Sequence, residues 1–339
     1  MSDRRPIFQP NELSNDAVVS MRTRIISAIV AIAILLPIVL VGDWAFFVAI
    51  GLATVFGVIE IIRCAKRKYS KVLYITGLIL ALLVLCWNII RSLPLSSDWR
   101  IFDSFHNLYI SITVVFIGIC LSAITIIIDK GFTIVDACFI FTIVLLVALG
   151  FQSALFLRYY PSYYAHQIMG FDAPYFNIFD NLESAGLFCY VVVGACLNDA
   201  FAYFVGVFFG KHKMNPRISP KKTWEGFFGG VFLTAATLIA WAFILDAVTH
   251  GEHTILKHFI DIEHWYHVLA LAFLIPLVSV LGDLVFSSMK RYYGIKDFGN
   301  LMPGHGGVLD RVDSVVFAAT TVAIYICIFS NNGGGFLLP

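Results

Sequence analysis

The sequence is poor in charged residues. Only 13% of its 339 residues are Asp, Glu, Lys or Arg, whereas a soluble domain carries about 25%. Hydrophobic residues make up 59% of the chain, and the mean hydropathy is +0.86. This composition excludes an ordinary soluble globular protein and predicts an integral membrane protein.

Cysteine pairs and sequence repeats are also missing. The seven cysteines form no CxxC pair, and most of them lie within apolar segments, so neither a disulfide framework nor a structural zinc site is indicated. No repeat, heptad pattern or separate soluble domain can be recognised. Residues 1–23 form a polar tail that we expect to be disordered and cytoplasmic, and residues 331–339 form a second short tail.

Long apolar runs dominate the rest of the chain, and they are continuous rather than alternating. A helix of about 19 residues crosses the hydrocarbon core of a bilayer, and continuous runs favour a helical bundle over a β-barrel. About nine runs are found, at residues 24–42, 44–63, 72–90, 108–128, 133–157, 185–209, 227–248, 267–286 and 313–329. The predicted fold class is therefore an all-α polytopic membrane protein.

Basic residues are divided unequally between the two sides of such a bundle. Nineteen of the 23 Lys and Arg residues fall on the side that carries the N-terminus. Cytoplasmic loops of membrane proteins carry this excess of positive charge, so the N-terminus is expected to be cytoplasmic. No targeting extension can be identified, and the expected location is the inner membrane of a bacterium.

Ionisable residues divide the predicted bundle into two regions. Residues 24–184, with about five helices, hold few internal charges, and we interpret Glu60 and Asp136 there as snorkelling or capping residues of a scaffold. Residues 185–330, with about four helices, are expected to be catalytic, with the active site at the cytoplasmic face. Asp199 in this region lies roughly 16 Å from the cytoplasmic end of its run. A carboxylate at that depth needs a partner, water or a cation.

Further acidic residues gather where the last two apolar runs end and begin. Asp283 is expected about one turn from the cytoplasmic surface, and Asp310 and Asp313 share one helix face through their i, i+3 spacing. Between them, the segment PGHGG allows a tight turn whose amides can point at an anion. We expect these acids to converge at one depth, near the lipid headgroups.

Basic residues flank the acidic positions on the same side of the membrane. They are Lys290, Arg291 and Lys296, and, in the loop after residues 185–209, Lys211, Lys213, Arg217, Lys221 and Lys222. Carboxylates that bind a divalent cation, beside basic groups that neutralise phosphates, match the needs of phosphoryl or nucleotidyl transfer. Topology alone also explains Lys and Arg in cytoplasmic loops, and an Asp at a helix start is a favourable cap. Asp199 favours the phosphate site, because topology does not require it.

Three segments of this region carry motifs at fixed spacing. They are NDAFAYFVGVFFGKHK, PRISPKKTWEG and SSMKRYYGIKDFGNLMPGHGGVLDRVDS, which lie within residues 198 to 314. The last contains S-x-x-K-R, K-D, P-x-H-G-G and D-R-x-D. These segments resemble the signature of the phosphatidate cytidylyltransferases, also called CDP-diacylglycerol synthases. Met302 and Phe286 depart from the family pattern, and Phe286 replaces a Glu that many bacterial members carry.

The resemblance implies that CTP and phosphatidic acid react to give CDP-diacylglycerol and pyrophosphate. The expected partners are CTP, phosphatidic acid and the lipid bilayer, without nucleic acid, and a homodimer is left open. Mg²⁺ is the expected cofactor, and a monovalent cation is left open. Asp283 and Asp310 are the expected metal ligands, with Asp199, Asp297 and Asp313 as second choices.

Other residues of the motifs have expected roles at the phosphates. The catalytic candidates are Asp283, Asp310, Lys290, Arg291 and His305. Ser219, Lys221, Lys222 and Thr223 would clamp the triphosphate of CTP, while Lys290 and Arg291 would contact the lipid phosphate or pyrophosphate. The remaining substrate-binding candidates are Lys213, Arg217, Lys296, Gly306, Gly307 and Arg311. We expect His305 to hydrogen-bond a phosphate, because phosphatidate is already ionised and needs little help from a general base.

Some alternatives stay open at this point. Trp224 and Glu225 are either an interface anchor and a helix-dipole partner or direct substrate contacts. A CTP-dependent polyprenol kinase, or a cytidylyltransferase for an ether-lipid phosphate, would need a similar site. An ion-coupled secondary transporter would use Asp199 near the midplane, but no inverted repeat is visible and the charges crowd one side.

Overall fold

Long helices account for most of the described chain. The computed structural model describes residues 15–64, 71–92, 116, 118–121, 123–128, 133–169, 178–249, 265–299, 301 and 306–329. The helices are α1 (Asn15–Val41), α2 (Asp43–Cys64), α3 (Lys71–Ser92), α5 (Ile134–Met169), α6 (Ile178–Phe209), α7 (Trp224–Thr249), α8 (Trp265–Tyr292) and α9 (Leu309–Phe329). Residues 118–121 and 123–128 are also helical.

Five helices within the described ranges, α2, α5, α6, α7 and α8, are long and apolar enough to cross a membrane. Shorter apolar helical stretches lie at Ile29–Val41, Lys71–Leu85 and Gly118–Ile128. The predicted all-α polytopic membrane fold is confirmed. The count of nine spans stays a prediction, because length and composition establish only these five.

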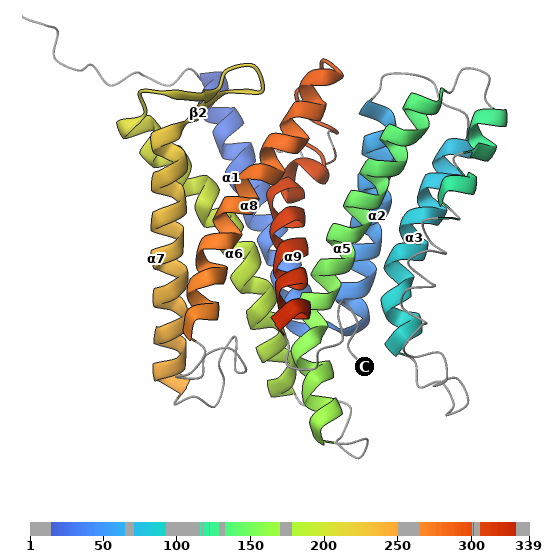
Figure 1. Ribbon diagram of the computed structural model, residues 1–339. Helices are drawn as coiled ribbons and strands as arrows, with labels where there is room; N and C mark the ends of the chain where they lie inside the picture. Colours follow the sequence, from blue (N-terminus) through green and yellow to red (C-terminus); the bar gives the residue numbers. More distant parts are fainter. Residues whose placement is uncertain are drawn as a thin grey trace, which may run out of the picture.

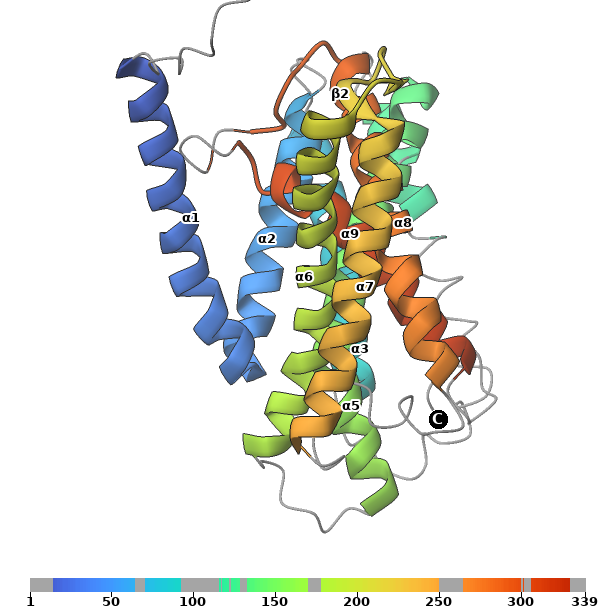
Figure 2. The same cartoon turned by 90° about the vertical axis from the view of Figure 1, so that its left-hand side faces the viewer.

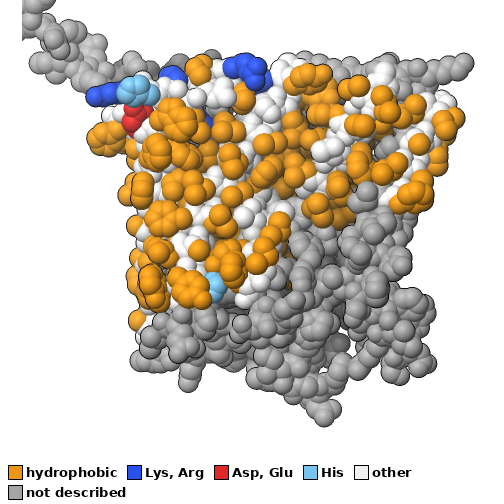
Figure 3. Space-filling view, in the orientation of Figure 1, with side chains coloured by type: hydrophobic (Ala, Val, Ile, Leu, Met, Phe, Trp, Pro, Cys, Tyr) orange, Lys and Arg blue, Asp and Glu red, His pale blue; other side chains and the backbone are white. Residues whose placement is uncertain are grey.

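The helices run alternately up and down, so that the loops carrying the predicted site lie at one end of the bundle. Figure 1 shows the start of α1, the β-hairpin between α6 and α7, and the end of α8 at this end. Apolar side chains cover most of the described surface in Figure 3, and the Lys and Arg side chains visible there lie along the edge with the hairpin. An apolar belt below a basic rim fits a protein that lies in lipid.

Helix α5 lies between two groups of helices. One apolar core joins α6, α7, α8 and α9 around Tyr190, Leu238 and Leu271. Of the other two core regions, one lies among α2, α3 and α5, and the second joins these helices to α8 and α9 through Phe286 and Leu309. Gly150 lets α5 approach α9 closely, because a Cβ added there would lie 2.9 Å from the Cβ of Val316.

Helix α1 diverges from the other helices toward the hairpin end, as Figure 2 shows. Its other end is tied to the bundle by Arg158 of α5, whose side chain is fully buried. The Arg158 guanidinium donates hydrogen bonds to the carbonyl of Val39 (2.8 Å) and the carbonyl of Leu40 (3.2 Å). These are among the last carbonyls of α1, which lack partners within the helix.

A short β-hairpin connects α6 to α7. Strand β1 (Lys213–Asn215) pairs antiparallel with β2 (Ser219–Thr223). The hairpin ends at Thr223, whose hydroxyl accepts a hydrogen bond from the Gly226 amide (3.2 Å) and so caps α7. Because β2 leads directly into α7, the position of its lysines is tied to the start of a long helix.

Candidate active site

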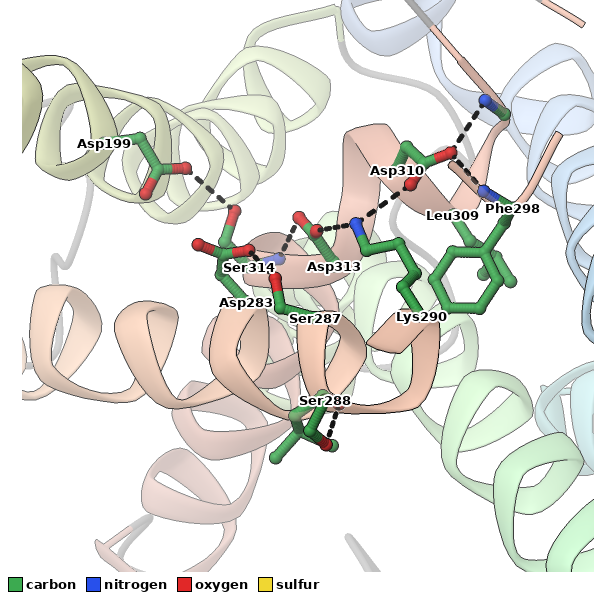
Figure 4. Close-up of polar contacts among 12 residues, drawn as sticks. Asp199, Asp283, Ser287, Ser288, Lys290, Phe298, Leu309, Asp310, Asp313 and Ser314 are labelled. Atoms are coloured by element: carbon green, nitrogen blue, oxygen red, sulfur yellow. Dashed lines mark hydrogen bonds and ion pairs between the residues drawn. The ribbon is translucent and has the colours of Figure 1, made fainter. Parts of the chain in front are cut away.

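The acidic residues of α8 and α9 come together, as expected from the sequence, and Asp199 of α6, which was expected deeper in the bundle, lies beside them (Figure 4). The Asp199 carboxylate of α6 accepts a hydrogen bond from the Ser314 hydroxyl of α9 at 3.4 Å. Asp283 of α8 interacts electrostatically with both Asp199 and Asp313. Residues from three helices thus form a row of carboxylates, which we call the acid row: Asp199, Asp283, Asp313 and Asp310.

Lys290 of α8 provides the positive charge at one end of the acid row. Its Nζ lies 3.0 Å from Asp310 Oδ1 and 3.8 Å from Asp313 Oδ2. The three side chains are only 3% to 12% exposed, and the ammonium also lies 5.4 Å from the centre of the Phe298 ring. The positive charge of Lys290 lowers the free-energy cost of burying the two negatively charged carboxylates.

Lys222 of the hairpin provides the charge at Asp283. The Lys222 ammonium forms an ion pair with Asp283 Oδ2, while the Ser287 hydroxyl donates to Asp283 Oδ1 at 3.1 Å. Asp283 and Ser287 share one face of α8, because they are four residues apart. The ion pair therefore connects the loop expected to hold CTP with an acid expected to hold a metal.

Helix α8 runs farther than the apolar run 267–286 indicated. The depth expected for Asp283, about one turn from the cytoplasmic surface, stays a prediction. The end of α8 lies at Tyr292 and not near residue 286. Nine further residues place Asp283 about 14 Å from that end. Lys290 and Arg291 in the last turn favour the longer helix, because cations stabilise a helix C-terminus.

The extension of α8 also separates Lys290 from Arg291. Lys290 points to the acid row, whereas Arg291 donates to the carbonyls of Ile218 (3.2 Å) and Ile295 (3.3 Å). Arg291 and Arg217 line a cavity of about 570 Å³ that lies beside the hairpin and the end of α8. Neighbouring residues on a helix point about 100° apart, so the two cations serve different places.

The hairpin divides its predicted substrate residues into exposed and buried ones. Lys213, Arg217 and Lys221 are exposed, and Ser219 is partly exposed. Thr223 is only 5% exposed, and its side chain fills the space above Gly206 and Gly210. Thr223 therefore acts here as a helix cap rather than as an open phosphate contact.

Trp224 and Glu225 both contact residues at the start of α7 or in the hairpin, and their two alternative roles stay predictions. The Trp224 ring packs on Phe227 and Phe228 and is 43% exposed. Glu225 Oε1 lies 2.6 Å from His212 Nδ1, and the His212 amide donates to the same carboxylate. Glu225 thereby closes the hairpin onto the start of α7.

Gly306 and Gly307 are the described residues of the glycine-rich segment for which the sequence predicted a tight turn. Gly306 has a φ of +88°, in the region that favours glycine. The amides of Gly307 and Phe298 donate to Asp310 Oδ2 at 3.0 and 2.8 Å. Of the amides that we expected to point at an anion, the Gly307 amide donates to a carboxylate of the protein.

Glu60 of α2 is the residue of this site that the sequence analysis assigned to the scaffold. Its carboxylate accepts hydrogen bonds from the amides of Val308 (2.9 Å) and Leu309 (3.0 Å). Glu60 is a capping residue, as one of the two interpretations held. The helix that it caps is α9, which is distant in the sequence, and not its own helix α2. Snorkelling is wrong, because Glu60 is only 7% exposed. A buried acid within an apolar run was the available signal. Asp136 caps its own helix through Thr133.

Several predicted site residues are exposed or lie outside the described part of the chain. Lys296, Asp297 and Arg311 are exposed. His305 and Pro303 lie outside the described residues, so the role expected for His305 stays a prediction. Asp297 is thus an exposed candidate ligand, next in sequence to Phe298, whose amide donates to Asp310.

The chemistry of the acid row suits a hard divalent cation. Carboxylate oxygens are the ligands that Mg²⁺ prefers in proteins, and Asp199, Asp283, Asp310 and Asp313 supply them. Within the residues that the structure describes, no three His, Cys, Asp or Glu side chains form a ready ligand shell. Lys222 and Lys290 instead neutralise Asp283 and Asp310.

Comparison with known proteins identifies the family. The model of the "Cytidylyltransferase family" matches residues 22–329. The phosphatidate cytidylyltransferase of Bacillus subtilis (strain 168) is 30% identical over 314 residues, which cover 92% of this chain and 100% of that protein. The enzyme of the same name from Staphylococcus haemolyticus (strain JCSC1435) is 30% identical over 307 residues, or 90% of this chain and 99% of the relative. The chain with this acid row therefore belongs to the cytidylyltransferase family.

Proposed function

We propose that this protein transfers the cytidylyl group of CTP to phosphatidate, forming CDP-diacylglycerol and releasing pyrophosphate. Relatives that are named phosphatidate cytidylyltransferase align with about nine-tenths of the chain or more. The proposal extends their activity to this chain.

The observation that carries the proposal is the direct contact between the three motif segments. Asp199 of the first segment contacts Ser314 of the third, at 3.4 Å. Arg291 of the third segment donates to the Ile218 carbonyl of the second, at 3.2 Å. Residues that are far apart in the sequence therefore meet at one end of the bundle, with carboxylates and lysines alternating between them. This supports a site for a polyanion.

The reaction joins two anions, so the main task of the protein is to hold and neutralise them. A phosphate oxygen of phosphatidate attacks the α-phosphorus of CTP. The bond from the α-phosphorus to the oxygen that bridges to the β-phosphorus breaks, and pyrophosphate leaves with that electron pair. The attacking oxygen is already ionised, so no side chain needs to remove a proton.

Basic residues on different elements can hold the two substrates separately. Lys221 and Lys222 of the hairpin are proposed to bind the triphosphate, with Ser219 beside them. Arg217 and Arg291 line the neighbouring cavity and are proposed to bind the lipid phosphate. Binding at fixed places converts the encounter of two anions into a reaction within one complex.

Asp283 and Asp310 are proposed to hold Mg²⁺, which when bound neutralises charge on the phosphates and on the leaving pyrophosphate. Asp313 lies between them in Figure 4 and is a further candidate, as is Asp199. Lys222 and Lys290 keep these acids neutralised in the structure. The two lysines can therefore turn to substrate phosphates when a cation takes over the acids.

A direct test follows the label of CTP into lipid. Membranes that contain the protein are incubated with phosphatidate and CTP labelled either in cytidine or at the γ-phosphate. We expect cytidine label in the lipid product and no γ-label. Transfer of γ-label would instead show a kinase, and ether-lipid or polyprenyl acceptors test the substrate class. If neither label enters phosphatidate-derived lipid, the proposal is refuted.

The protein is an integral membrane protein, and its basic end is proposed to face the cytoplasm. The excess of Lys and Arg at the end with the acid row supports this orientation. Bacterial relatives support an inner membrane. The homodimer stays a prediction.

A further inference from the structure

The Glu60 carboxylate binds the beginning of α9 from a different part of the chain. Glu60 lies in the last turns of α2, and its two oxygens accept from the amides of Val308 (2.9 Å) and Leu309 (3.0 Å), which are 248 and 249 residues away. Helix α9 begins at Leu309. The first amides of a helix lack partners within it and attract negative charge, so the carboxylate suits this place.

Two glycines provide the space for this carboxylate. A Cβ added to Gly307 would lie 2.6 Å from the carboxyl carbon of Glu60, and one added to Gly299 would lie 2.6 Å from Oε1. Real Cβ atoms do not approach other atoms this closely. Gly299 and Gly307 therefore both lie against the Glu60 carboxylate, which occupies a defined position.

The same segment is held from its other side by the acid row. The Gly307 amide donates to Asp310 Oδ2 at 3.0 Å, and Asp310 Oδ1 lies 3.0 Å from Lys290 Nζ. Three successive amides, those of Gly307, Val308 and Leu309, thus bind two carboxylates. A displacement of the Glu60 contact moves the backbone that carries Asp310.

We propose that Glu60 is a positioning residue, which fixes the segment 306–310 so that Asp310 and Lys290 face the substrate site. This inference rests on the proposed function for the meaning of that site. Through Glu60, helix α2 of the N-terminal half would thus help to position residues of the active site. A displacement of about 1 Å in a catalytic group can lower a rate about 100-fold, so a distant anchor can control turnover.

Two substitutions separate the charge of Glu60 from its length. In Glu60→Gln, one oxygen becomes an NH₂ group, which faces a backbone N–H instead of accepting from it. In Glu60→Asp, the charge remains but the side chain is shorter by one carbon–carbon bond, about 1.5 Å. Val58→Ala is the matched control, because Val58 lies on the same helix but packs toward Gly77 of α3.

The test combines turnover with amide hydrogen exchange in the purified full-length protein. For Glu60→Gln we expect kcat to fall about 10-fold to 100-fold, with the KM for CTP changed less than about threefold. Exchange of the Val308 and Leu309 amides should become at least about tenfold faster. Glu60→Asp should show smaller changes of both kinds, and Val58→Ala should show neither.

The proposal is overturned if Glu60→Gln keeps the exchange protection of Val308 and Leu309, or if kcat falls equally in Val58→Ala. If Glu60→Gln does not fold, Glu60→Asp decides, since unchanged exchange there contradicts the contact. Exchange does not depend on turnover. A protein that lacks cytidylyl transfer would therefore refute the proposed function and leave the anchoring contact testable.

Discussion

Buried polar side chains bind different partners in the two halves of the bundle. In α2, α3 and α5, buried hydroxyls bind carbonyls one turn away in their own helix, such as Thr54 to Ile50 (2.8 Å) and Ser153 to Leu149 (2.8 Å). In α6, α8 and α9, carboxylates bind a lysine or a hydroxyl of another helix. The first arrangement satisfies polar groups at little cost, whereas the second keeps charges that a stable core does not need.

Two ionisable residues of the N-terminal half depart from this division, and both cap another helix. Arg158 binds the carbonyl end of α1, and Glu60 binds the amide end of α9. Each side chain has the charge that its helix end attracts. The comparison suggests that buried charges in the first half hold helix ends, while those in the second half form the reactive site.

The largest effect is expected at the acid row. Asp283→Asn and Asp310→Asn should each lower cytidylyl transfer at least about 100-fold, because each removes a charge aimed at the proposed metal and phosphates. The rate should be measured in membranes at matched expression, over a range of magnesium concentrations. Near-normal turnover of both variants at every concentration would refute the metal assignment.

Replacing Lys290 tests whether one buried ion pair contributes both to the stability of the protein and to its activity. Lys290→Met should lower both, because Asp310 and Asp313 lose their common counter-charge in a place that is almost fully buried. Breaking a buried ion pair costs about 3–5 kcal/mol of unfolding free energy, which thermal unfolding in detergent can measure. Lys221→Met is the control, since Lys221 is exposed, and should raise the KM for CTP without lowering the unfolding temperature. Equal unfolding temperatures for the two variants would contradict the structure.

Patterns along the chain predicted the fold class and the convergence of the acids, because both depend on local information. Continuous apolar runs indicate helices, and the alternation of sides brings Asp283, Asp310 and Asp313 to one end. The contact between Glu60 and α9 was not predictable in this way, because no spacing relates residues 248 positions apart. The separation of Lys290 from Arg291 depended on where α8 ends, and helix ends are poorly determined by an apolar run that fades into charged residues.

Arg158 tests whether a buried charge of the N-terminal half serves stability alone. Arg158→Leu leaves the carbonyls of Val39 and Leu40 without their donor, and we expect a loss of about 1–3 kcal/mol in unfolding free energy. The kcat per folded molecule should change less than about twofold, since the contact lies at the end of α1 that is far from the hairpin. Thermal unfolding and turnover of the same preparation decide this. A fall in kcat as large as that of Lys290→Met would break the division between the two halves.

The smallest effect on stability is expected at the contact between two uncharged side chains, Thr76 and Thr125, on different helices of the N-terminal half. Thr76 is 9% exposed, donates to the Leu73 carbonyl at 3.1 Å, and lies 3.4 Å from the Thr125 hydroxyl. Thr125 also donates to the Leu121 carbonyl at 2.8 Å, so it keeps a hydrogen bond when Thr76 is replaced. Thr76→Val should therefore change the unfolding free energy by no more than about 1 kcal/mol and leave kcat unaltered. A loss as large as that of Arg158→Leu would show that neutral contacts between helices, and not only charged caps, determine the stability of this half.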